Sequence, residues 1–195
     1  MKIIDCHTHP LFQDKELQEF AKRAGVKFSL DGLIKEMKES KIEEKCKKIY
    51  EIAEKNNKPV IIHTGDPFYN FAKIKYTHPI HIDDIAVEHP NLKVIIAHTG
   101  NPWIEDAVEI AYKNENVYLD ISGWFFKNIP KDYGKIMIQR LKFILSYLET
   151  SDKILFGTDW PLIRMKKYVD FVKNSGINKN EIKKIMYKNA LNLFW

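Results

Sequence analysis

The sequence is poor in cysteine, with only Cys6 and Cys46 among its 195 residues. The two do not form a CxxC pair, and one disulfide would be a weak framework for a chain of this length. We therefore expect reduced thiols in a cytoplasmic protein. Charged and histidine side chains occur from the very start of the sequence, which does not fit a signal peptide.

The sequence also has no apolar run long enough to span a membrane and no block of like charges that would mark a nucleic-acid-binding arm. Its net charge of +5 comes from scattered lysines, so we expect neither nucleic acid nor membrane as a partner. With 45% hydrophobic and 29% charged residues, the composition is that of an ordinary globular protein. We expect one domain over residues 1–195, with a sizeable core.

Short apolar runs alternate with segments of helical spacing. The runs are continuously apolar, which is typical of parallel strands covered on both faces. The predicted strands are residues 2–4, 59–62, 92–97, 117–121 and 154–156. The predicted helices are residues 16–24, 83–88, 102–113, 135–148, 165–174 and 179–193. This alternation predicts an α/β fold built from βα units.

Residues 31–56 depart from this alternation. The segment contains no proline, and its apolar residues recur at helical spacing. We therefore predict one long helix there, with no strand inside residues 33–54.

Side chains that can bind metal follow four of the predicted strands. His7 and His9 would point to the same side of an extended chain, while His63, His98 and Asp159 each follow a later strand. In a βα barrel the carboxyl ends of the strands build the active site. Imidazole and carboxylate ligands suit Zn²⁺ above all, and also Mn²⁺, Fe²⁺, Co²⁺ or Ni²⁺. The sequence thus predicts a metal site at which a bound water would become acidic.

The motifs DCHTH, IIHTG, AHTG and GTDWP, in this order, resemble the metal motifs of the amidohydrolase superfamily. The similarity is to the branch that includes aminocarboxymuconate-semialdehyde decarboxylase, and it covers residues 2–10 and about 57–195. The ligands that it implies for a single divalent metal are His7, His9, His63 and Asp159. It also implies that His98 works on water or substrate, with Asp159 as the second catalytic group.

The chain is short for this family, because a TIM barrel takes about 250 residues. The resemblance implies that barrel strands two to four are lost within about residues 31–56. We therefore expect a truncated TIM-barrel-like, metal-dependent hydrolase fold with about five parallel strands. Such a sheet cannot close as an eight-stranded barrel does, so we also expect a homodimer.

Three functions fit the motifs. The first is hydrolysis of an amide, ester or lactone by a metal-activated water. The second is metal-dependent decarboxylation or hydration of an unsaturated carboxylic acid. The third is a non-catalytic remnant barrel that serves as an assembly or metal-binding module, as the missing strands would suggest.

Further residues near the strand ends are candidates for substrate contacts. Trp103, Trp124 and Trp160 could wall a pocket or pack in the core. Arg164 could bind a substrate carboxylate or lie on the surface, and the expected partner is a small molecule such as a carboxylic acid. Asp120 and Ser122 end the strand at 117–121, where they could support the ligands or have a structural role.

Overall fold

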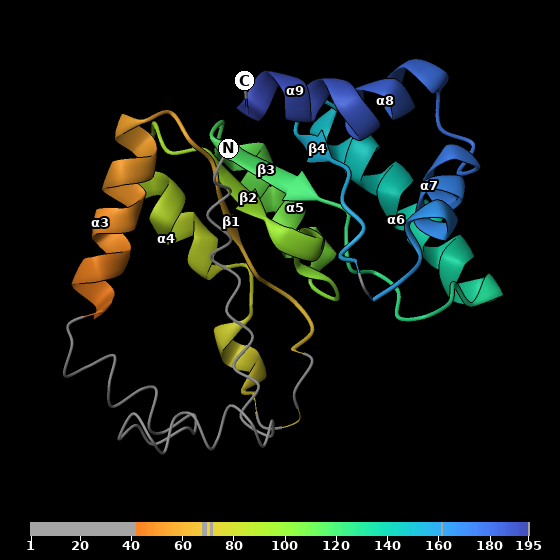
Figure 1. Ribbon diagram of the computed structural model, residues 1–195, viewed down its shortest axis with the longest axis horizontal. Helices are drawn as coiled ribbons and strands as arrows, with labels where there is room; N and C mark the ends of the chain where they lie inside the picture. The colour runs from red at the N-terminus through yellow and green to blue at the C-terminus, as the bar shows by residue number, and fades with distance from the viewer. Residues whose placement is uncertain (1–41, 68–69, 71, 161, 195) are drawn as a thin grey trace.

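The computed structural model describes residues 42–67, 70, 72–160 and 162–194 (Figure 1). The elements, in chain order, are the helix α3 (Ile42–Lys55), strand β1 (Val60–Ile62), 3₁₀ helix η1 (Ile74–Tyr76), α4 (His81–Glu88), β2 (Val94–Ile96), 3₁₀ helix η2 (Ala97–Gly100), α5 (Ile104–Lys113), β3 (Val117–Asp120), α6 (Lys131–Leu148), β4 (Ile154–Leu155), α7 (Met165–Lys173), α8 (Lys179–Lys183), π-helix η3 (Lys184–Lys188) and α9 (Asn189–Phe194). The predicted strand at 2–4, the predicted helix at 16–24 and the first part of segment 31–56 lie outside the described residues.

The described strands form one parallel sheet in the order β1-β2-β3-β4. Each strand pairs with the strand that follows it in the chain, and helices α4, α5 and α6 lie in the three connections. In Figure 1, α3 and α4 lie at the β1 side of the sheet, and α8 and α9 lie by β4. The predicted α/β fold with parallel strands is therefore confirmed.

The two faces of the sheet have different coverings. Alternate strand residues, among them Ile96, Leu119 and Ile154, point into the main core and pack with residues of the surrounding helices. The residues between them point to the other face, where Ile95 and Leu155 pack with Leu193 of α9. This second cluster is small, and its partly buried members include Ile61 and Tyr118. In a complete barrel this second face would be the interior.

Partly buried polar side chains join the chain segments that precede the strands. The amide of Asn116, just before β3, donates to the carbonyls of Ala86, His89 and Leu92 at 2.9 to 3.2 Å. Lys153, just before β4, donates through Nζ to the carbonyls of Ala111 and Asn114. Burial lowers the pKa of Lys153, and the two contacts satisfy two of its three donors. These interactions support the fold at the amino ends of the strands, leaving the carboxyl ends for chemistry.

The described helices lie where they were predicted, but several begin or end at other residues. The predicted long helix is confirmed over its described part, as α3. Helix α6 begins at Lys131, before the predicted residue 135, because Pro130 directly precedes it with the φ of −61° that suits a helix start. The predicted helix at 179–193 contains the π-helix η3, where the carbonyl of Ile185 accepts from the backbone N–H of Phe156. No helix in the described ranges is both long and apolar enough to cross a membrane.

Candidate active site at the carboxyl ends of the strands

Three predicted site residues lie together at the carboxyl ends of the strands. His63 follows β1, His98 lies in η2 directly after β2, and Asp159 follows β4. The rings of His63 and His98 meet edge to face with their centroids 5.0 Å apart. A Cβ atom placed on Gly123 would lie 2.3 Å from Nδ1 of His98 and 2.9 Å from Oδ2 of Asp159. The imidazole of His98 and the carboxylate of Asp159 therefore converge on one point.

The backbone of His98 has an uncommon left-handed conformation, with a φ of 59° and a ψ of 15°. Its carbonyl accepts hydrogen bonds from Nε1 of Trp124 and from the backbone N–H of Asn101, each at 3.0 Å. The next residue, Thr99, also has a positive φ, and its hydroxyl donates to the carbonyl of Asp120. Such backbone strain costs on the order of 1 kcal/mol or more and concentrates at functional sites. The surrounding contacts therefore fix the position from which the imidazole projects.

Asp120 and Ser122 form a hydrogen-bonded chain that reaches His98. The carboxylate of Asp120 accepts from the backbone N–H of Ser122 at 2.9 Å and from its hydroxyl at 2.6 Å. The Ser122 hydroxyl oxygen lies 3.0 Å from Nδ1 of His98. Burial raises the pKa of Asp120, and the hydrogen bonds from Ser122 act in the opposite direction. Of the two roles considered from the sequence, the structure supports the first: Ser122 contacts the predicted catalytic residue His98, and Asp120 holds Ser122.

Two glycines make room for this chain. Gly123 has a φ of 65°, and any side chain there would collide with His98. A Cβ on Gly157 would lie 2.7 Å from Oδ1 of Asp120 and 2.8 Å from Cβ of Ser122. Sequence reasoning missed both positions, although glycine directly after a strand end is the available signal for close approach of other groups.

The predicted substrate residues lie in different surroundings. Trp124 is 3% exposed and touches the site through its hydrogen bond to His98. Trp160 follows Asp159 directly and is 65% exposed. Trp103 stacks at a tilt on His78, with ring centroids 4.7 Å apart. Arg164 is exposed and precedes α7, where its carbonyl accepts the first helical hydrogen bonds.

Within the described part of the chain, no three histidine, cysteine, aspartate or glutamate side chains are grouped so that they could hold a metal ion. The structure brings His63 and Asp159 to the same end of the sheet, whereas the other two predicted ligands, His7 and His9, lie outside the described residues. Imidazole and carboxylate groups at a shared strand end are the donors that a divalent transition metal takes. The described donors therefore fit such a metal in kind and would form half of the predicted ligand set.

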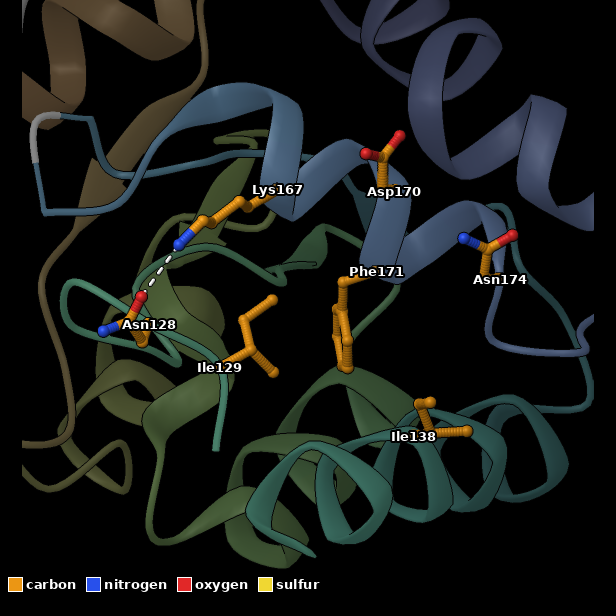
Figure 2. A pocket seen from close by; sticks show the side chains of 7 residues that line it. All are labelled: Asn128, Ile129, Ile138, Lys167, Asp170, Phe171 and Asn174. Carbon is orange, nitrogen blue, oxygen red and sulfur yellow. Dashed lines mark hydrogen bonds between the residues drawn. The ribbon is translucent and has the colours of Figure 1, made fainter. Parts of the chain in front are cut away.

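An open pocket of about 570 Å³ lies between α6 and α7, and Figure 2 shows the side chains that line it. Its lining residues are Asn128, Ile129, Ile138, Lys167, Asp170, Phe171 and Asn174. None of them is a predicted metal ligand or catalytic residue, and Nζ of Lys167 donates to Oδ1 of Asn128 at 2.8 Å. We therefore place the candidate site at the strand ends.

Comparisons with known proteins identify a family and several relatives. The sequence model of the family described as "Amidohydrolase" matches residues 25–194. Among curated proteins, gamma-resorcylate decarboxylase from Polaromonas sp. strain JS666 is 31% identical over 128 residues, which is 55% of this chain and 35% of that protein. The chain therefore spans about a third of the length of this relative.

Solved structures also match. An uncharacterized TIM-barrel protein from Bordetella bronchiseptica is 30% identical with a TM-score of 0.59, over 74% of this chain and 48% of that one. A dihydroxybenzoic acid decarboxylase from Polaromonas sp. JS666, with bound manganese and the inhibitor 2-nitroresorcinol, has a TM-score of 0.53 at 24% identity, over 74% and 52% of the two chains. At 24% identity, the similarity to the decarboxylase structure shows a shared fold and nothing more. In both cases this chain spans about half of the matching barrel.

Proposed function

This chain belongs to the amidohydrolase family, and from that premise we propose that it is a metal-dependent decarboxylase of a small carboxylic acid. The observation that carries the choice of reaction is the 31% identity to gamma-resorcylate decarboxylase. The site supports it with an imidazole and a carboxylate that converge at Gly123. Of the three functions that fit the motifs, this moves the second ahead of hydrolysis.

We propose His7, His9, His63 and Asp159 as the ligands of one divalent metal. When bound, the metal would supply positive charge that holds and polarises oxygen atoms of the substrate. Zinc is the ion that these ligand types favour, while the similar barrel with bound manganese makes Mn²⁺ the main alternative. The ligand set from described residues is incomplete, so His7 and His9 are essential to the proposal.

Decarboxylation needs a proton at the carbon atom that loses the carboxylate. The carbon–carbon bond breaks, its electron pair stays on the substrate carbon, and CO₂ leaves while that carbon takes a proton. His98 is placed to move this proton through Nε2, because its Nδ1 faces Ser122. The carboxylate of Asp159 lies beside the same imidazole, on its Nδ1 side, and can accept a hydrogen bond from a substrate hydroxyl. We propose Trp103, Trp124, Trp160 and Arg164 as substrate contacts, with Trp160 and Arg164 the more accessible.

The test combines metal analysis with an assay of the purified full chain. We expect about one divalent metal per chain and the release of CO₂ from 2,6-dihydroxybenzoate or a related hydroxybenzoate, abolished by a chelator. Ester or lactone cleavage without CO₂ release would replace this proposal by the hydrolase function. A protein that binds metal but neither releases CO₂ from hydroxybenzoates nor cleaves esters or lactones would favour the non-catalytic module.

The ligand assignment is tested separately by elemental analysis. We expect that His7→Ala or His9→Ala abolishes metal binding, because a site with few ligands loses most of its affinity when one is removed. His81→Ala is the matched control, since this exposed histidine contacts the carbonyl of Lys75 and is not a predicted ligand. Two tightly bound metals per chain would contradict a mononuclear site.

A further inference from the structure

The Ser122 hydroxyl has a single proton, and its place determines the state of His98. In the structure this proton is donated to Oδ2 of Asp120 at 2.6 Å, while Oδ1 of the same carboxylate accepts the backbone N–H of Ser122 at 2.9 Å. A hydroxyl that donates to a carboxylate can only accept from its other neighbours. At 3.0 Å, Nδ1 of His98 must therefore be the donor.

From this geometry we propose that Asp120 is a positioning residue that acts through Ser122 to keep His98 in the tautomer with its proton on Nδ1. The lone pair of neutral His98 then lies on Nε2. The role that this gives His98 in the reaction rests on the proposed function, whereas the tautomer itself does not.

Other contacts in the site hold Asp120, Ser122 and His98 in this arrangement. Ser122 is 4% exposed, so water has little access to replace His98 as its partner. The hydroxyl of Thr99 donates to the carbonyl of Asp120 at 2.8 Å, and Nε1 of Trp124 donates to the carbonyl of His98. The loop after β3 is therefore bonded to the loop after β2 through both backbone and side chains. The absence of side chains at Gly123 and Gly157 leaves the space that the imidazole and the carboxylate occupy.

The opposite tautomer would break the series of hydrogen bonds from Asp120 to His98 at Ser122. With the proton on Nε2, the lone pairs of Nδ1 and of the Ser122 oxygen would face each other at 3.0 Å. Relief would require Ser122 to turn its proton toward His98 and leave Oδ2 of the partly buried Asp120 without that donor. Removing one partner from a buried hydrogen-bonded group is costly, which favours the Nδ1–H form.

The tautomer can be read directly by NMR. The full chain, labelled with ¹⁵N-histidine and loaded with diamagnetic Zn²⁺, gives long-range ¹H–¹⁵N spectra in which protonated and unprotonated ring nitrogens differ widely in ¹⁵N shift. His98 is assigned by the signal missing from His98→Ala. We expect a protonated Nδ1 in neutral His98 of the wild type. An unprotonated Nδ1 would overturn the proposal without any variant.

Two variants test the role of the hydrogen bonds that connect Asp120 and Ser122 to His98. We expect Asp120→Asn and Ser122→Ala each to shift the ratio of Nδ1–H to Nε2–H forms of His98 about tenfold or more, since one charge-linked hydrogen bond is lost. Asp106→Asn is the matched control: Asp106 lies 3.7 Å from Nε2 of His78, so its loss should leave His98 unchanged. The proposal is wrong if a variant that melts like the wild type keeps the wild-type tautomer.

The activity readout separates this proposal from the proposed function. If hydroxybenzoates are substrates, both variants should lower kcat more than they change KM, because His98 remains present but in the wrong form. A wild type that shows the Nδ1–H tautomer but no decarboxylation would refute the reaction while leaving the positioning role intact. A tautomer that does not depend on Asp120 or Ser122 would refute the positioning role whatever the activity.

Discussion

His98 is held on both its backbone and its ring, and this is the basis of a prediction about its role. Its carbonyl has two donors, and its Nδ1 contacts Ser122. We expect His98→Ala to keep the metal and to lower kcat/KM by about 100-fold or more, as for a group that moves a proton in the reaction. Activity assays paired with elemental analysis check this. Loss of metal in this variant would instead make His98 a ligand.

Gly123 offers a second prediction at the same scale. In Gly123→Ala the new methyl group would have to occupy the space of the His98 ring, at a φ of 65° that favours glycine. We expect a loss of activity of the same order as in His98→Ala and a fall in the free energy of unfolding of about 1–3 kcal/mol. Activity assays and urea denaturation measure the two effects.

Gly176→Ala is the control for that substitution. Gly176 also has a positive φ, 74°, but a Cβ there would meet only Nζ of Lys142 at 3.8 Å. It should share the loss of stability from backbone strain, on the order of 1 kcal/mol, without loss of activity. Equal loss of activity in both variants would show that general destabilisation, and not the collision with His98, is the cause.

At the scale of elements, the strands were predictable because each is a continuous apolar run. The runs at 59–62, 92–97, 117–121 and 154–156 all contain the observed strands. Helix ends were less predictable, since the start of α6 depends on Pro130 and its end on Glu149 with a φ of 54°. The π-helix η3 depends on a contact with Phe156, far away in the sequence, which helical periodicity cannot reveal.

The candidate site was predictable in part for the same reason. His63, His98 and Asp159 could be placed because each follows an apolar run, and the ends of parallel strands share one edge. The hydrogen bonds from Asp120 through Ser122 to His98 could not be predicted. They depend on the left-handed backbone of His98 and on the loop after β3, which are set by tertiary contacts.

Helices α4 and α5 are joined by a polar contact that yields a prediction of pH dependence. Asp83 of α4 accepts hydrogen bonds from Nζ of Lys113 and from the amide of Asn114. These bonds hold the pKa of Asp83 below its ordinary value of 3.8, with Lys113 the largest cause. A lowered pKa in the folded state means that the stabilisation is full above 3.8 and is lost as the pH falls through the folded value.

We therefore expect Asp83→Asn to lower the free energy of unfolding by about 1 kcal/mol near neutral pH. The difference from the wild type should narrow as the pH falls below about 4. Urea denaturation over this range tests the prediction, with Asp132→Asn as a control, because Asp132 is 88% exposed in its pair with Lys135. A difference that stays constant down to acidic pH would assign the effect to packing and not to the charge of Asp83.

For the whole molecule, the sheet has two edges. Within the described ranges, β1 pairs with β2 alone and β4 with β3 alone. The second face carries the half-buried Ile61 and Tyr118, and burial raises the pKa of Tyr118. A strand edge can pair with a strand of another chain, and an apolar face can pack against one, so these edges and this face favour further association.

We expect a homodimer in solution whose assembly is coupled to metal binding, since closing the arc of strands would bring the ligands together. Light scattering at micromolar concentration should give twice the chain mass, falling after treatment with a chelator. His81→Ala, which removes no predicted ligand, should assemble like the wild type. A stable monomer that retains its metal would show that one chain closes the site by itself.

The order in which the strands pair also bears on how the chain is made. Because β2 joins β1, β3 joins β2 and β4 joins β3, each of the described strands pairs with the strand that leaves the ribosome next. Translation adds about 5–20 residues per second, which is slow compared with local folding. The nascent sheet can therefore grow one βα unit at a time, without waiting for a distant segment. Its growing edge is exposed until the next strand arrives, which makes that edge the place where chaperones would bind.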